Sequence, residues 1–146
     1  MIRSEADPIE PVHFSCDGAP EPPETGREGG LELRSDRCVG FASDAGYDEK
    51  AALKAATCFR GGMQMGSVCG AVTGGLLALG LAGIEDREAV DEYIRKIREA
   101  RGGIIDCRDI VSEAAQKGIA KKRYCDAMIC ECVGYAEEIL KENGRI

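Results

Sequence analysis

The chain has 146 residues and a formal charge of −7, a length that suits one globular domain and excludes several. Its acidic balance argues against binding to nucleic acid, because the phosphate backbone requires clustered basic side chains. Eight cysteines, with no charged and apolar leader pattern at the start, indicate a reducing, cytoplasmic compartment. Cysteine enrichment in such a compartment points to metal binding or redox chemistry rather than to structural disulfides.

The first 37 residues differ in composition from the rest. All five prolines lie here, together with nine acidic and four basic side chains. Such a segment cannot bury enough apolar surface to offset its ordering entropy, so residues 1–37 are expected to form a disordered or loosely docked N-terminal arm. The chain's one histidine, His13, belongs to this arm, which excludes a Cys-His or Ser-His-Asp apparatus from the domain expected over residues 38–146.

A short helix is predicted over residues 48–58, where alanine and leucine recur at helical spacing and Asp48 is placed to cap the first turn. The following uncharged stretch, residues 61–84, is long enough to span a bilayer. Eight of its residues are glycine, however, which lowers its hydrophobicity below that of a membrane helix. We therefore expect no transmembrane segment.

Small residues recur at every fourth position of this glycine-rich stretch. They are Gly62, Gly66, Gly70, Gly74, Ala78 and Ala82. On a helix they form one ridge that another backbone can approach closely, as in a homodimer, or that leaves room for a bulky group. If residues 61–66 form a loop instead, Ser67 becomes the N-cap of a helix over about residues 68–81.

Three further helices are predicted. The segment 85–103 begins with acidic and ends with basic residues, and its apolar face consists of Val90, Tyr93, Ile94 and Ile97. Asp106 caps a short helix that Gly118 ends, and a long helix covers about residues 123–142. The apolar stripe of that last helix consists of Cys125, Ile129, Cys132, Ala136 and Leu140. No segment alternates with period two, so we expect an all-α fold, a small helical bundle with a glycine-rich central helix.

Several cysteines fall at predicted helix starts. Cys69, Cys107 and Cys125 each lie in a first turn, where unpaired N–H groups and the helix dipole favour a thiolate. Because consecutive helices of an up-down bundle alternate in direction, these three and Cys38 are expected at the same end. Four thiolates there suit an iron–sulfur cluster or zinc, and equally a redox pair with spare thiols.

An alternative interpretation treats cysteines as small hydrophobic residues of a helical core. We prefer it for Cys58, in an alanine-rich helix, and for Cys132, on the apolar stripe. Cys130 is expected off that stripe and Cys16 lies in the arm, so neither is assigned a role.

The string GGMQMGSVCGAVTGGLLALGL resembles the signature of the C_GCAxxG_C_C family of redox-active proteins, with the motif itself at Cys69–Gly74. The resemblance continues in DEKAALKAATCFRGGM before it, in IIDCRDIV around Cys107 and in KKRYCDAMICECVGYAEEIL at the C-terminus. It implies a small helical protein with four characteristic cysteines. By motif these are Cys69, Cys107 and Cys125, with Cys38 as the first, although Cys16 or no equivalent is the alternative there.

The resemblance and the residues together give one leading hypothesis. Cys38, Cys69, Cys107 and Cys125 ligate an iron–sulfur cluster, most plausibly 2Fe-2S, with Gly70 and Gly74 leaving room for it. The runner-up is thiol–disulfide exchange without metal, an oxidoreductase activity in which Cys69 reacts with Cys107 or with Cys38. Its partner would be an unidentified redox protein. A third class is a structural protein that dimerises through its glycine ridge.

Overall fold

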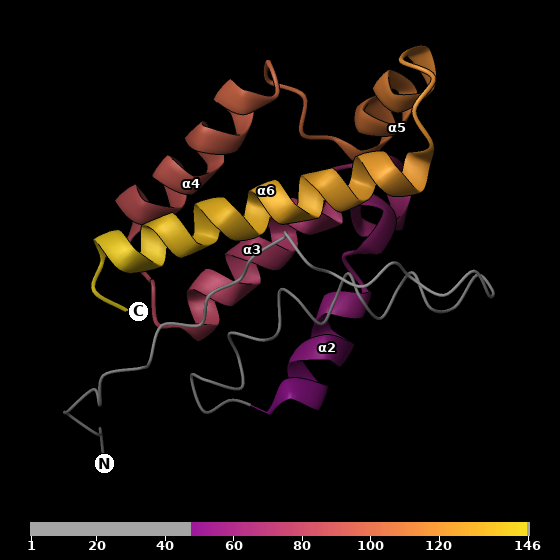
Figure 1. The fold of residues 1–146 in the computed structure, drawn as a ribbon. Coiled ribbons are helices and arrows are strands. Elements are labelled where there is room, and N and C mark those ends of the chain that lie inside the picture. Colours follow the sequence, from indigo (N-terminus) through magenta and orange to yellow (C-terminus); the bar gives the residue numbers. More distant parts are fainter. Residues whose placement is uncertain (1–47, 146) are drawn as a thin grey trace.

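The computed structural model describes residues 48–145, so the expected arm, Cys16 and Cys38 lie outside the described part. Within that range the chain forms five α-helices (Figure 1). They are α2 (Glu49–Thr57), α3 (Gly70–Leu81), α4 (Arg87–Ala100), α5 (Cys107–Gln116) and α6 (Lys121–Glu142). The described residues contain no strand beyond one isolated bridge, which confirms the all-α prediction for this part of the chain.

Helix α6 is the element on which the others pack. Helices α3, α4 and α5 all contact it, and Figure 1 shows it crossing the length of the bundle. Its buried side chains recur every three or four positions: Tyr124, Met128, Ile129, Cys132, Val133, Ala136, Ile139 and Leu140. The predicted stripe is thus confirmed from Ile129 onward. No helix between residues 48 and 145 has the length and apolar character needed to cross a membrane.

The packing of α3 against α4 depends on one glycine and one tyrosine. Tyr93 of α4 is fully buried, and its hydroxyl donates a hydrogen bond to the carbonyl oxygen of Val72 at 3.2 Å. A Cβ atom at Gly75 would lie 1.9 Å from that hydroxyl oxygen. Glycine costs about 1 kcal/mol in a helix relative to alanine, and here the space it leaves is filled by the tyrosine ring.

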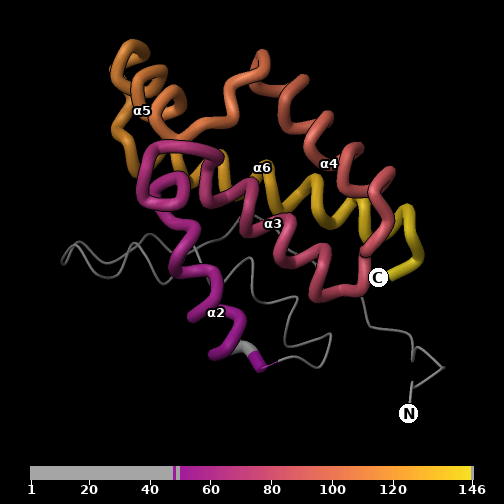
Figure 2. The backbone as a smooth tube through the Cα atoms, turned by 180° about the vertical axis from the view of Figure 1, so that it is seen from behind, coloured from indigo at the N-terminus to yellow at the C-terminus, as the bar shows by residue number. Residues whose placement is uncertain are grey.

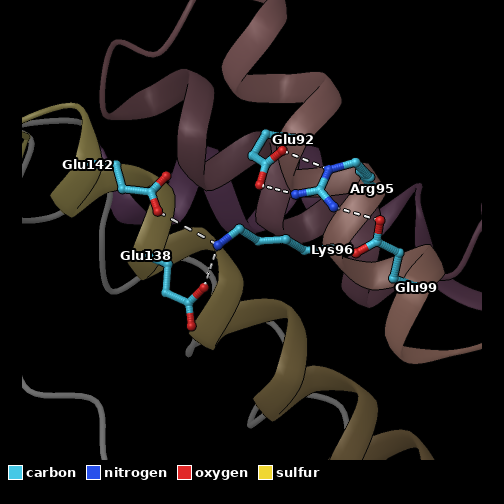
Figure 3. A network of polar contacts seen from close by, with 6 residues as sticks. All are labelled: Glu92, Arg95, Lys96, Glu99, Glu138 and Glu142. Atoms are coloured by element: carbon cyan, nitrogen blue, oxygen red, sulfur yellow. Dashed lines mark hydrogen bonds and ion pairs between the residues drawn. The ribbon is translucent and has the colours of Figure 1, made fainter.

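Ion pairs connect α4 to α6 on the surface (Figure 3). Lys96 donates to Glu138 at 2.8 Å and lies 3.7 Å from Glu142, so it joins the two helices. Arg95 binds two carboxylates of its own helix, Glu92 and Glu99. Such exposed pairs contribute at most about 1 kcal/mol each, so the apolar core remains the main source of stability.

Helix α2 begins as predicted, because the carboxylate of Asp48 accepts hydrogen bonds from the backbone N–H groups of Lys50 and Ala51. The helix projects from the bundle in both views (Figures 1 and 2). Ala52 is buried there and packs with Leu53 and Leu81 in a small cluster separate from the main core. Helix α2 is therefore joined to the bundle largely through the turn that follows it.

That turn, Gly62–Gly66, interrupts the predicted glycine ridge. It closes with a hydrogen bond from the N–H of Ser67 to the carbonyl oxygen of Gly62 at 3.0 Å, and its first glycine has φ +65°. Gly62 and Gly66 thus lie in a left-handed turn, and a continuous helical ridge over residues 62–82 is wrong. The loop alternative is correct, since a left-handed conformation is open to glycine at little cost.

The predicted cap at Ser67 is also wrong. Val68 pairs with Asp106 in an antiparallel bridge, which keeps residues 67–69 extended. The helix can therefore begin only after these residues. Cys69 therefore occupies the N-cap of α3, which begins at Gly70 rather than at residue 68. Asp106 does stand at the N-cap of α5, but its side chain makes no capping hydrogen bond.

Candidate functional site

Three cysteines line one cavity of about 540 Å³ at the end of the bundle where α3 and α5 begin. Cys69 comes from the N-cap of α3, Cys107 from the first residue of α5, and Cys125 from α6. Cys38 lies outside the described residues. The expectation that helix direction brings these thiols together is thus met for three of the four.

The bridge between Val68 and Asp106 explains why two of these cysteines are neighbours. The N–H of Cys69 donates to the carbonyl oxygen of Ile105 at 2.8 Å, and the N–H of Cys107 donates to that of Ser67 at 2.7 Å. Side chains alternate between the two faces of extended backbone, so Cys69 and Cys107 share the face opposite to the bridging pair. Two hydrogen bonds therefore fix the relative position of the segments that carry the thiols.

The left-handed turn packs directly against Cys107. A Cβ atom at Gly62 would lie 2.8 Å from the Cβ of Cys107 and 2.3 Å from the carbonyl oxygen of Ser67, so only glycine fits. Arg108 holds the other side of the turn, where its Nε donates to the carbonyl oxygen of Gly66 at 3.2 Å. Figure 2 shows this turn beside the start of α5. The turn thus forms the support of the cysteine on α5.

Gly70 and Gly74, which we expected to make room for a cofactor, both line the cavity. At Gly70 a Cβ atom would lie 3.1 Å from the carbonyl oxygen of Phe59, so the lack of a side chain also lets α3 begin close to the preceding segment. Gly74 is buried one turn further along the same face. Because these two glycines on one face have no side chains, this side of α3 is open to the cavity.

Helix α6 begins at Lys121, two residues before the predicted start, and this changes the position of Cys125. Cys125 lies in the second turn, not in the first as predicted. Its backbone N–H is therefore engaged in the helix instead of free at the helix end. The side chain is half-buried and lines the cavity.

The thiol of Cys69 does not have the low pKa expected for a helix start. Burial raises its pKa, and the nearby thiols of Cys107 and Cys125 raise it further. The backbone N–H groups of Ala71 and Val72 act in the opposite direction but do not outweigh the loss of water. The prediction of an intrinsically stabilised thiolate at Cys69 is wrong because the thiol is largely buried, which disfavours its charged form.

The remaining described cysteines do not line the cavity. Cys132 is fully buried on α6, as the core interpretation predicted. Cys58 is exposed at the C-cap of α2, so its assignment to the core is wrong; α2 projects from the bundle and offers little surface to bury it. Cys130 is half-buried on α6.

Sequence reasoning missed the polar side chains of the cavity wall. Arg60, Gln64 and Lys121 line it, and no Asp or Glu among the described residues does. Lys121 is the first of three consecutive basic residues, a pattern that by itself is typical of a solvated helix end. Arg60 and Gln64 gave no signal, because their positions depend on the left-handed turn. The three thiols of the described part therefore lie in positively charged surroundings.

The match to known families follows this geometry. The family model described as "Putative redox-active protein (C_GCAxxG_C_C)" matches residues 38–139. The chain belongs to this family. The match covers more than half of the chain and includes every residue that lines the cavity. No curated protein and no solved structure matches the chain.

Proposed function

We propose that this redox-active protein uses Cys38, Cys69, Cys107 and Cys125 as ligands of an iron–sulfur cluster, most simply 2Fe-2S. The observation that carries the proposal is that three thiols from three different helices line a single cavity. The family match begins at Cys38, which supports that residue as the fourth ligand.

The donor set fits such a group. Thiolates are the usual ligands of iron–sulfur clusters, and glycines at positions 70 and 74 keep the wall of α3 free of side chains. Among residues 48–145, no three Cys, His, Asp or Glu side chains lie close enough to hold one metal ion. The four-thiol set of the proposal includes Cys38, which lies outside these residues.

A bound cluster would supply one-electron transfer. The chain's own residues position and protect it. The bridge between Val68 and Asp106 holds two ligand segments in register, and the turn against Cys107 prevents that ligand from moving. Burial of Cys69 keeps water away from this thiol in the cavity wall.

The test is the visible spectrum of anaerobically purified full-length protein, with iron and sulfide counted on the same sample. We expect absorption that bleaches with dithionite and is lost in Cys69→Ser. Cys58→Ser is the matched control, because this exposed cysteine does not line the cavity, and it should keep the spectrum. Unchanged colour and iron in Cys69→Ser would exclude the assignment.

A second candidate function, thiol–disulfide exchange, is favoured by the bridge that makes Cys69 and Cys107 neighbours. In this reaction the two thiols lose two protons and two electrons and form one S–S bond, while an organic disulfide accepts both and becomes two thiols. Differential alkylation and mass spectrometry would then detect a Cys69–Cys107 disulfide after mild oxidation of a colourless, metal-free protein. An unchanged count of free thiols would contradict this candidate.

A further inference from the structure

The wall of the cysteine cavity contains charged side chains in addition to the three thiols. Arg60 and Lys121 line it, and neither forms an ion pair with any residue of the described part. No carboxylate from residues 48–145 lines the cavity. The cavity thus combines two cations that lack a carboxylate partner among the described residues.

Gln64 reaches the same wall through an unfavourable backbone conformation. It has φ +62° and follows Met63 at φ +55°, both in the left-handed region that non-glycine residues rarely adopt. Each such residue costs about 1–2 kcal/mol, and this cost is tolerated mainly where the conformation serves a function. The turn is held at both ends, by the Ser67–Gly62 hydrogen bond and by Arg108 on Gly66. The turn thereby places the side-chain amide of Gln64, a hydrogen-bonding group, on the same cavity wall as Arg60 and Lys121.

The rest of the wall is apolar. Phe59 and Ile129 line the cavity together with the small residues Ala56 and Ala71. A volume of about 540 Å³ falls within the range of roughly 300–1,000 Å³ in which proteins enclose small organic ligands. Cationic groups on an apolar wall match a molecule that has an anionic group and an apolar body.

We propose that the cavity binds a small organic anion, whose carboxylate or sulfonate pairs with Arg60 and Lys121 and whose apolar body contacts Phe59 and Ile129. Gln64 donates from its side-chain amide to the same anionic group. The inference deepens the proposed function, because it names the class of molecule that the site holds beside the thiols. Binding itself requires no electron transfer.

Equilibrium dialysis of full-length, anaerobically purified protein with radiolabelled benzoate tests this inference. We expect saturable binding of benzoate, and binding of uncharged benzamide that is at least about tenfold weaker, because a charge-assisted hydrogen bond is lost. Arg60→Gln and Lys121→Gln should each weaken benzoate about tenfold and leave benzamide unchanged.

Lys122→Gln is the matched control. It removes the same charge from the same end of α6, and Lys122 is exposed like Lys121 but does not line the cavity. Its benzoate affinity should stay within about twofold of the parent protein, since a charge outside the cavity makes no hydrogen bond to the bound anion. Absence of saturable benzoate binding, equal binding of benzamide, or equal weakening in Lys121→Gln and Lys122→Gln would each overturn the inference.

Iron and sulfide are counted on every dialysed sample, which separates this inference from the proposed function. A colourless protein that binds benzoate contradicts the cluster and supports the anion site. A protein with stoichiometric iron that binds neither probe contradicts the anion site and supports the cluster.

Discussion

The two ends of the bundle differ in how their side chains are packed. At the packed end, formed by α4 and the C-terminal halves of α3 and α6, the large side chains Leu79, Tyr93 and Leu140 are fully buried. At the cysteine end, formed by the left-handed turn and the starts of α3, α5 and α6, the core continues through Val72, Ile110 and Met128, and the chain also surrounds a cavity. Two non-glycine residues there, Met63 and Gln64, adopt left-handed conformations.

This difference shows where stability is gained and where it is given up. Apolar burial contributes about 25 cal/mol per Å², so the packed end stabilises the fold. The cysteine end keeps glycine at positions where a side chain would block the cavity or displace Cys107. Local strain and open space are typical of functional sites and are supported by the rest of the structure.

The largest expected effect comes from breaking the packed end. Tyr93→Ala removes a fully buried ring between α3 and α4 and should lower the free energy of unfolding by about 3–5 kcal/mol. Tyr93→Phe keeps the ring and loses only the hydrogen bond to Val72, so it should cost about 1 kcal/mol. Urea denaturation measures both. Equal losses in the two variants would show that the hydroxyl, not the packing, matters.

A substitution at the cysteine end should disturb the site with a smaller effect on stability. Gly62→Ala places a Cβ against Cys107 and the backbone of Ser67 in a left-handed turn. It should lower the free energy of unfolding by about 2–4 kcal/mol, and the bound iron should be lost. Gly61→Ala is the matched control, since Gly61 has φ +62° but open space around it, and should cost about 1 kcal/mol. Full iron content in Gly62→Ala would contradict a supporting role for the turn.

The surface ion pairs should matter less than either change. Lys96→Gln removes the contact from α4 to Glu138 and Glu142 of α6 and should lower stability by at most about 1 kcal/mol. Arg95→Gln breaks only pairs within α4 and should cost less, by a few tenths of a kcal/mol. Thermal denaturation at low and high salt tests the order, because screening should reduce the Lys96 effect.

The smallest expected effect is a dependence on acidic pH near α5. The hydrogen bond from Lys117, followed by that from the hydroxyl of Tyr124, holds the pKa of Glu113 below its usual range. The folded state thus favours the ionised carboxylate, which adds stability above the unfolded pKa, and this stability is lost as the pH falls through the folded value. Urea midpoints of the parent protein and Glu113→Gln should differ at pH 7 and converge near pH 3. A constant difference would contradict the shift.

The sequence predicted most of the elements, since their signals are local. The cap at Asp48, the apolar face of α4 with Tyr93 and Ile97, and the stop at Gly118 all follow from residues close in the chain. The family resemblance identified the cysteines of interest, and the match over residues 38–139 confirmed the family. Their roles as ligands or as a catalytic pair stay predictions.

What only the tertiary structure decided is how distant segments meet. The bridge between Val68 and Asp106 joins residues 38 positions apart, and it moved the start of α3 beyond Ser67. Burial by the whole cavity wall raised the pKa of Cys69, against the local effect of the helix start. The sequence by itself determined the helices and the types of residue available for chemistry. Long-range hydrogen bonds and the left-handed turn decided which of those residues share one cavity, and burial decided the direction of the pKa shift of Cys69. These effects depend on contacts that no local pattern encodes.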